Sequence, residues 1–448
     1  MMKDLTSGKP AAVLWKFSIP MLISVIFQQI YTIADSVIAG KFAGKNALAE
    51  VGASFPITMI FMAVAIGSNI GCSVIVSNLY GQRETRRMKT AIFTSLIAAA
   101  ALAVILSVLG VALSGVFIDL LHTPKGIRPN AVAYLQIYIA GFIFLYIYNV
   151  VNGIFTSLGD STTPLLLLIG SSLGNIVLDL VFVIVFRWGV PGVAWATFVA
   201  QGMACIVALL VLLVRLKKIV VVGKVLKFSW AMLGKIGAIA VPSILQQSFV
   251  SVGNLLIQIL VNQSGENVIA GYSAAVKLNT FAITCFNTLS NGMSSFTAQN
   301  VGAEKYKRIK EGMRAGVGMV LLIALVFFLS FFCFSKPLIS FFMSEDTMSV
   351  EAVETGVSFL RTITPFYFVV SVKLFADGVL RGTESIQLFM ITTFTDLILR
   401  VILAYVFYPI WAAQGIWNSW PVGWIIATIL SLVFYKRVTN RLLKQGQQ

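Results

Sequence analysis

The sequence predicts an all-α polytopic membrane protein with twelve transmembrane helices in two pseudo-symmetric six-helix lobes. Of its 448 residues, 58% are hydrophobic and only 11% are charged, whereas a soluble globular protein carries about 25% charged residues. The apolar residues are gathered in long runs, and the second half of the chain repeats the pattern of the first. These three observations together determine the predicted fold class.

The apolar runs define the predicted helices. Each is long enough to cross a bilayer, which takes about 20 residues. The first run is too long for a signal peptide and no small-residue cleavage site follows it, so we expect it to be retained as a span. The approximate cores of the twelve spans are 14–40, 51–80, 90–121, 131–158, 163–186, 191–214, 236–262, 268–299, 313–343, 354–380, 386–409 and 414–435.

Lys and Arg residues are concentrated in alternate loops. They gather before the first run, at 83–89, at 215–235, at 305–314, at Arg381 and after the last run. By the positive-inside rule, this distribution predicts that both termini are cytoplasmic, which requires an even number of spans. Topology and contact with anionic lipid explain the net charge of +16, so we expect no nucleic-acid partner.

The two halves resemble copies of one another at a shift close to 221 residues. The matching segments are IPMLI at 19–23 with VPSIL at 241–245, GKNALAEVGAS at 44–54 with GENVIAGYSAA at 265–275, and GQRETRRMK at 81–89 with GAEKYKRIK at 302–310. Parallel repeats of this kind place the substrate between lobes that rock against each other. The predicted division is an N-lobe at 1–214, a cytoplasmic linker at 215–235 and a C-lobe at 236–448.

Asp35 and Asp179 are lone acids inside the apolar runs of the first half. An ionisable group in a membrane span costs at least ~2.5 kcal/mol to insert and generally lines a cavity where it has a function. Asn175 lies four residues before Asp179 on the same helix face, and we expect Asn152 and Thr197 on the neighbouring spans to contribute to the same site. Carboxylate, amide and hydroxyl oxygens suit a hard cation. The sequence therefore predicts a cation site in the N-lobe, with Na⁺ at Asp35, Asn175 and Asp179. Alternatively, Asp35 carries a proton, because burial disfavours an ionised carboxylate.

The second half replaces these groups. At the repeat shift, Asn152 corresponds to Lys373, Asn175 to Asp396 and Asp179 to Arg400. Lys373 and Asp377 are four residues apart, as are Asp396 and Arg400, so each pair is expected to form along one helix face. Because a self-neutralised pair binds no cation, the coupling site is predicted in the N-lobe only.

These residues resemble the multidrug and toxic compound extrusion (MATE) family. The resemblance is carried by Asp35 in IADSVIAG, by GDSTTP at 159–164, and by GNIVLD followed by GVPGVAWAT. It implies a bacterial inner-membrane antiporter that exports amphipathic organic compounds as Na⁺ or H⁺ enters, acting as a monomer and without a bound cofactor. It also implies that Asp35, Asn152, Asn175, Asp179 and Thr197 form the coupling site. One departure is that Val250 and Val370 stand where some Na⁺-coupled relatives carry acids.

Polar residues inside other spans are candidates for the substrate cavity. They are Gln28, Gln29, Tyr31, Gln247, Lys277, Asn287 and Asn291. Amides within spans also hydrogen-bond neighbouring helices, and this is the alternative interpretation. If Lys277 faces the cavity, it disfavours simple cations and favours a zwitterionic or anionic substrate.

No enzyme motif is present: the chain has no Walker A loop, GxSxG elbow or HExxH helix. The four cysteines lie far apart in apolar runs and are expected to be buried hydrophobic residues. Two other functions remain open. One is a lipid-linked oligosaccharide flippase, favoured by Lys277, Lys373 and Arg400. The other is a receptor or scaffold that transports nothing.

Overall fold

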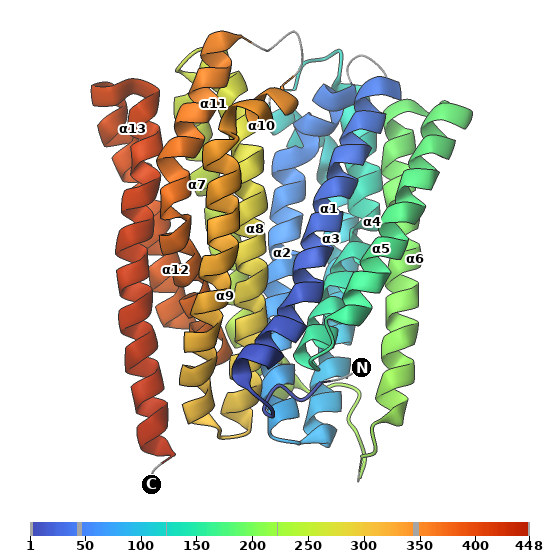
Figure 1. Ribbon diagram of the computed structural model, residues 1–448. Helices are drawn as coiled ribbons and strands as arrows, with labels where there is room; N and C mark the ends of the chain where they lie inside the picture. The colour runs from blue at the N-terminus through green and yellow to red at the C-terminus, as the bar shows by residue number, and fades with distance from the viewer. Residues whose placement is uncertain (1–2, 43–46, 122, 222, 344–348, 447–448) are drawn as a thin grey trace. The chain divides into compact units, whose positions relative to one another are not determined.

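The computed structural model describes residues 3–42, 47–121, 123–221, 223–343 and 349–446, except for the side chains of residues 34–37, 39–42 and 47–49. These residues form helices and no β-strand (Figure 1). Eleven helical stretches among them are long and apolar enough to cross a membrane. The last, α13, is interrupted by non-helical backbone at Trp411 and Ala412. It therefore comprises two spans, and the predicted all-α fold with twelve spans is confirmed.

The helices are labelled as in Figure 1. In chain order they are α1 (Pro10–Phe42), α2 (Ala47–Gly81), α3 (Thr85–Leu120), α4 (Arg128–Ser157), α5 (Thr162–Asp179), the π-helix η1 (Leu180–Val185), α6 (Gly189–Lys218), α7 (Trp230–Asn262), α8 (Glu266–Gly302), α9 (Tyr306–Cys333), α10 (Ser335–Phe341), α11 (Val350–Ile363), the 3₁₀ turn η3 (Thr364–Phe366), α12 (Tyr367–Gly382) and α13 (Ile386–Gln445).

Prolines account for the places where helices end inside the predicted spans. A proline ring excludes the carbonyl four residues earlier from a helical hydrogen bond. The ninth span was predicted to reach residue 343, but α9 ends at Cys333, four residues before Pro337. Pro365 similarly lies in the 3₁₀ turn that separates α11 from α12. Cys333, expected to be buried, is exposed at the end of α9, while the other three cysteines are buried.

The chain divides into two compact units. Unit 1 comprises Met1–Asp4 and Ile19–Ser248, and unit 2 comprises Leu5–Ser18 and Phe249–Gln448. The chain therefore passes between the units three times: after Asp4, inside α1 next to Pro20, and inside α7 about two turns after Pro242. The basic stretch 215–235 belongs to unit 1.

Unit 1 is organised around α4, which packs against α2, α3 and α6. The buried residues of α4 recur with helical spacing at Leu135, Ile139, Phe142 and Tyr146, as expected of a helix that buries one face. The ring of Phe142 meets that of Phe61 edge to face, with centroids 4.9 Å apart. The Tyr146 hydroxyl donates to Ser68 Oγ at 2.6 Å, so α2 and α4 are joined by both apolar and polar contacts.

Unit 2 is organised around α8 and the α11–α12 span, with α9 and α13 packed on them. Its core is aromatic. Tyr272 stacks on Trp417 with the two ring centroids 5.2 Å apart, and the edge of Phe359 meets both rings. The corresponding helices of the two halves thus occupy corresponding places within their own units, as a duplicated sequence predicts.

The segment GDSTTP at 159–164 anchors the start of α5. Gly159 has a positive φ of +74°, a conformation that favours glycine. Asp160 is buried, and its Oδ1 accepts hydrogen bonds from the backbone N–H groups of Thr162 and Thr163. Its Oδ2 accepts from Arg215 of α6. This part of the family-like motif therefore fixes the relative positions of α4, α5 and α6.

Two glycines allow α12 to approach α8 closely. Gly378 and Gly382 are spaced as in the small-xxx-small motif of membrane helices. A Cβ atom added at either position would meet backbone carbonyl oxygens of α8, those of Ser290 and Ser294 respectively.

We predict that Gly378→Ala destabilises the protein by about 1–3 kcal/mol, because the helices must separate to fit the methyl group. The measurement is thermal unfolding of the detergent-purified protein. Gly318→Ala on α9 is the matched control, since an added Cβ there has nothing within 4 Å. Equal stability of the two variants would show that the close approach of α8 and α12 does not contribute to the stability of the protein.

Candidate functional site

Two of the buried polar residues of unit 1, Asn175 and Asp179, lie on α5. Asp179 is fully buried, with 0% of its surface exposed, and Asn175 is 2% exposed. Both oxygens of the Asp179 carboxylate are inaccessible to solvent. Two polar side chains are therefore buried one turn apart on a single helix.

The amide of Asn175 lacks hydrogen-bond partners. Neither its Nδ2 nor its Oδ1 has one in the described structure. Leaving a buried polar atom unpaired costs roughly 1–3 kcal/mol, and such groups are rare in native proteins. An unpaired amide oxygen one turn from a carboxylate is therefore a good ligand for a small cation.

The α-helix changes to a π-helix immediately after Asp179, and η1 extends from Leu180 to Val185. π-Helical turns are rare and occur frequently at functional sites. Here the wider turn follows the buried carboxylate directly. No feature of the run LVFVIV predicted this change, because the same apolar residues are equally typical of an α-helix.

A small apolar cluster shows which helices meet near Asp179. Ile38 of α1, Val183 of η1 and Val193 of α6 are buried together, and Ile176 of α5 packs against them. Asp179 lies between Ile176 and Val183 in the sequence. Parts of α1, α5 and α6 therefore come together around the position of this carboxylate.

The other predicted ligands are placed as follows. Asp35 lies in α1 one turn before Ile38, but its side chain is outside the described residues. Thr197 lies on α6 one turn after Val193 and is half-buried. Asn152 is half-buried on α4, which packs against both α5 and α6.

These residues offer one kind of ligand atom. Carboxylate, amide and hydroxyl oxygens suit Na⁺, which would bind here as a transported ion. In the described part of the chain, no three His, Cys, Asp or Glu residues form a group that could hold a metal ion. The chemistry of the donors thus fits a weakly held alkali cation better than a resident transition metal.

The candidate substrate residues lie on three helices. On α1, Gln28 is exposed, and Gln29 and Tyr31 are half-buried. Gln247 is half-buried on α7. The remaining candidates are all exposed and all lie on α8: Lys277, Asn287 and Asn291.

In unit 2, the buried charges form a network centred on Lys373. Its ammonium group lies 3.0 Å from Asp377 Oδ2 and 3.9 Å from Asp396 Oδ2. Asp377 Oδ1 also accepts hydrogen bonds from Thr392 at 3.0 Å and from Ser431 at 2.7 Å. The predicted Lys373–Asp377 pair is therefore present, with its charges neutralised inside the unit.

The predicted pair of Asp396 and Arg400 is wrong. The Asp396 carboxylate lies near the Lys373 ammonium group instead. The Arg400 guanidinium lies over the ring of Trp420, 4.3 Å from its centroid. The face of an indole ring attracts a cation, so Trp420 competes with the carboxylate. Arg400 is 7% exposed, and its Nε has no hydrogen-bond partner in the described structure.

Arg381 was counted among the loop bases, but it lies in the last turn of α12 and is buried. Its guanidinium donates to Asn291 Oδ1 at 2.9 Å and to Ser290 Oγ at 2.6 Å. Its position at the edge of an apolar run gave no signal of burial. Val370, one of the two valines noted as a departure from the family resemblance, is 2% exposed within the aromatic core of unit 2.

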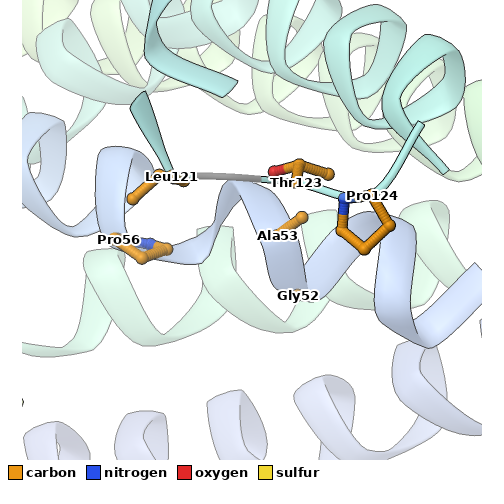
Figure 2. Close-up of a pocket in the computed structure, with 6 residues that line it drawn as sticks. All are labelled: Gly52, Ala53, Pro56, Leu121, Thr123 and Pro124. Carbon is orange, nitrogen blue, oxygen red and sulfur yellow. The ribbon is translucent and has the colours of Figure 1, made fainter. Parts of the chain in front are cut away.

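A pocket of about 260 Å³ lies in unit 1, and none of the predicted site residues lines it (Figure 2). It is lined by Gly52, Ala53, Pro56, Leu121, Thr123 and Pro124. Of these side chains, only Thr123 is polar. The pocket therefore offers no chemistry for binding a specific ligand.

The MatE family model matches two segments of this chain, residues 20–181 and 242–406. The chain belongs to the MATE family. The two matches fall on the two halves, as expected for an internal repeat. As a MATE protein, this chain is a transporter and not an enzyme, with many apolar helices that make it a multi-pass membrane protein.

The curated relatives of this MATE chain are named for drug resistance or for cofactor transport. A probable multidrug resistance protein of Bacillus subtilis, YpnP, is 27% identical over 97% of this chain and 96% of its own length. An FAD transporter of Shewanella oneidensis is 24% identical over 77% of each chain. The structure of a MOP superfamily transporter from Pyrococcus furiosus has a TM-score of 0.92 at 23% identity and covers 98% of both chains. At this identity, the structural match establishes the fold alone.

We predict that Asp377→Asn destabilises this MATE protein by about 3–5 kcal/mol, because it leaves Lys373 buried with only a distant counter-charge. Thermal unfolding in detergent measures the loss. The control is Asp119→Asn, which breaks an exposed pair with Arg128 and should change stability little. A loss no greater than that of the control would contradict the role assigned to the network.

Proposed function

We propose that this chain is a secondary active antiporter that exports amphipathic organic compounds in exchange for Na⁺ or H⁺. The coupling ion binds in unit 1 to Asp35, Asn175 and Asp179, with Asn152 and Thr197 nearby. The multidrug resistance names of relatives support the substrate class. The protein acts in a bacterial inner membrane with both termini cytoplasmic, as a monomer in contact with anionic lipid and without nucleic acid.

One observation carries the proposal. The amide of Asn175 is buried, has no hydrogen-bond partner among the described side chains and lies one turn from the buried carboxylate of Asp179. A scaffold position would be expected to satisfy these atoms. A site that is loaded and emptied during each cycle, in contrast, keeps ligand atoms available for the ion.

The difference between the halves supports a site in unit 1 alone. At the positions related by the repeat, unit 2 has Lys373, Asp396 and Arg400, and its two acids are both within 4 Å of Lys373. A cation entering this network would be repelled by two buried bases, Lys373 and Arg400. Unit 1 has no such bases inside its apolar runs.

The flippase alternative depends on a strongly basic cavity. Two of the three bases that favoured it, Lys373 and Arg400, are buried within unit 2. Lys373 forms an ion pair with Asp377, and the guanidinium of Arg400 stacks on Trp420. Only Lys277 is exposed. This arrangement favours export of individual amphipathic molecules over passage of a large polyanionic headgroup.

We predict that Asp35→Asn abolishes dye efflux driven by an ion gradient, because the neutral amide cannot exchange a cation or a proton. Asn175→Ala should lower the rate roughly tenfold or more by removing one ligand. Efflux of ethidium, an aromatic cation, and of carboxyfluorescein, an aromatic anion, from proteoliposomes is measured under separately imposed Na⁺ and H⁺ gradients, and the gradient that drives efflux identifies the ion. Asp119→Asn, at an exposed site on α3, is the control. Unchanged efflux in the Asp35→Asn variant would contradict the proposed coupling site.

A further inference from the structure

The helix α8 presents an exposed face that is polar along its length. Within this helix, all of whose residues are described, no large hydrophobic side chain is exposed. In contrast, α3 exposes Val108 and Leu120, and α9 exposes Val326, as lipid-facing helices do. The residues on this face recur every three or four positions, and we call them the α8 stripe: Lys277, Thr280, Asn287 and Asn291, which are exposed, and Thr284, which is half-buried.

The α8 stripe is suited to water and not to lipid. Its ends are fourteen residues apart, which is about 21 Å along a helix. A row of amides, hydroxyls and an ammonium group of that length is costly in hydrocarbon and is expected to line an aqueous cavity. We therefore expect the α8 stripe to be in contact with water.

The charge of the α8 stripe is positive. Lys277 is its one charged residue, and the only acid in α8 is Glu266 in the first turn. At the other end, Asn291 accepts a hydrogen bond from the buried guanidinium of Arg381. The amide oxygen of Asn291 is thus already engaged by a cation.

The interior of unit 2 adds to this positive charge. Its apolar runs contain six bases (Lys277, Arg314, Lys336, Arg361, Lys373 and Arg400) and three acids (Glu354, Asp377 and Asp396). Asp377 and Asp396 are both close to Lys373, and Arg400 lies against an aromatic ring. The runs of the first half contain three acids (Asp35, Asp119 and Asp179), and their one base, Lys16, lies in the part of α1 that belongs to unit 2. The two units therefore carry opposite charges in their spanning segments.

We propose that the α8 stripe binds the anionic group of an amphipathic organic anion, with Lys277 as its charged partner. This inference rests on the proposed export function and specifies its substrate class. An organic cation would meet Lys277 and no carboxylate on this surface. A carboxylate or phosphate group meets an ammonium and several hydroxyl and amide groups that can donate hydrogen bonds. The coupling cation and the anionic substrate thus bind to different units.

Binding of carboxyfluorescein, an aromatic anion, to the detergent-purified full-length protein tests the proposal by fluorescence anisotropy. Lys277→Gln should raise its Kd about tenfold, the loss of one charge-assisted contact, and Lys277→Arg should retain binding. Lys336→Gln is the matched control, because Lys336 is also an exposed lysine of unit 2 but lies on α10. Ethidium, an aromatic cation, should bind Lys277→Gln at least as well as the unmodified protein.

Three results overturn the inference: no binding of carboxyfluorescein, an equal Kd in Lys277→Gln and the unmodified protein, or an equal weakening of ethidium binding. None of these depends on an ion gradient. Failure of the proposed function would instead appear as the absence of gradient-driven transport of either dye in proteoliposomes. The two failures are therefore distinguishable.

Discussion

The energetic cost of placing a charge in hydrocarbon constrains every functional feature of this protein. A chain that is 58% hydrophobic and 11% charged retains few ionisable groups inside its spans, and each needs a compensating environment. These environments differ from one base to the next. Lys373 is paired with two carboxylates, and the guanidinium of Arg400 lies over the ring of Trp420. Arg381 donates hydrogen bonds to neutral side-chain oxygen atoms. Asp179 lies beside an amide whose two polar atoms have no partner in the described structure.

The duplicated halves thus use the same helix plan for different chemistry. Where unit 1 has Asn152, Asn175 and Asp179, the repeat places Lys373, Asp396 and Arg400 in unit 2. The substitutions replace ligand oxygens with charges that are neutralised or stacked internally. The two halves therefore share the packing of their helices and differ in the charges that the helices carry.

The sequence predicted the helices well and the side-chain partners only in part. The apolar runs gave the twelve spans, since burial in lipid requires internally satisfied backbone groups. The Lys373–Asp377 pair followed from its spacing, but the Asp396–Arg400 pair did not form, because Trp420 and Lys373 approach from other helices. Arg381 was assigned to a loop although it is buried. The position of Asp35 in α1 was predicted, and its side chain lies outside the described residues.

By itself, the sequence determined the number and order of the helices, the repeat, the family resemblance and the identity of the intramembrane charges. These depend on hydrophobicity and spacing along one chain. Tertiary structure alone decided the π-helical turn after Asp179, the burial of the Asn175 amide, the stacking of Arg400 and the exposed polar face of α8. Those features depend on which side chains from distant segments reach the same place, and a linear pattern does not contain that information.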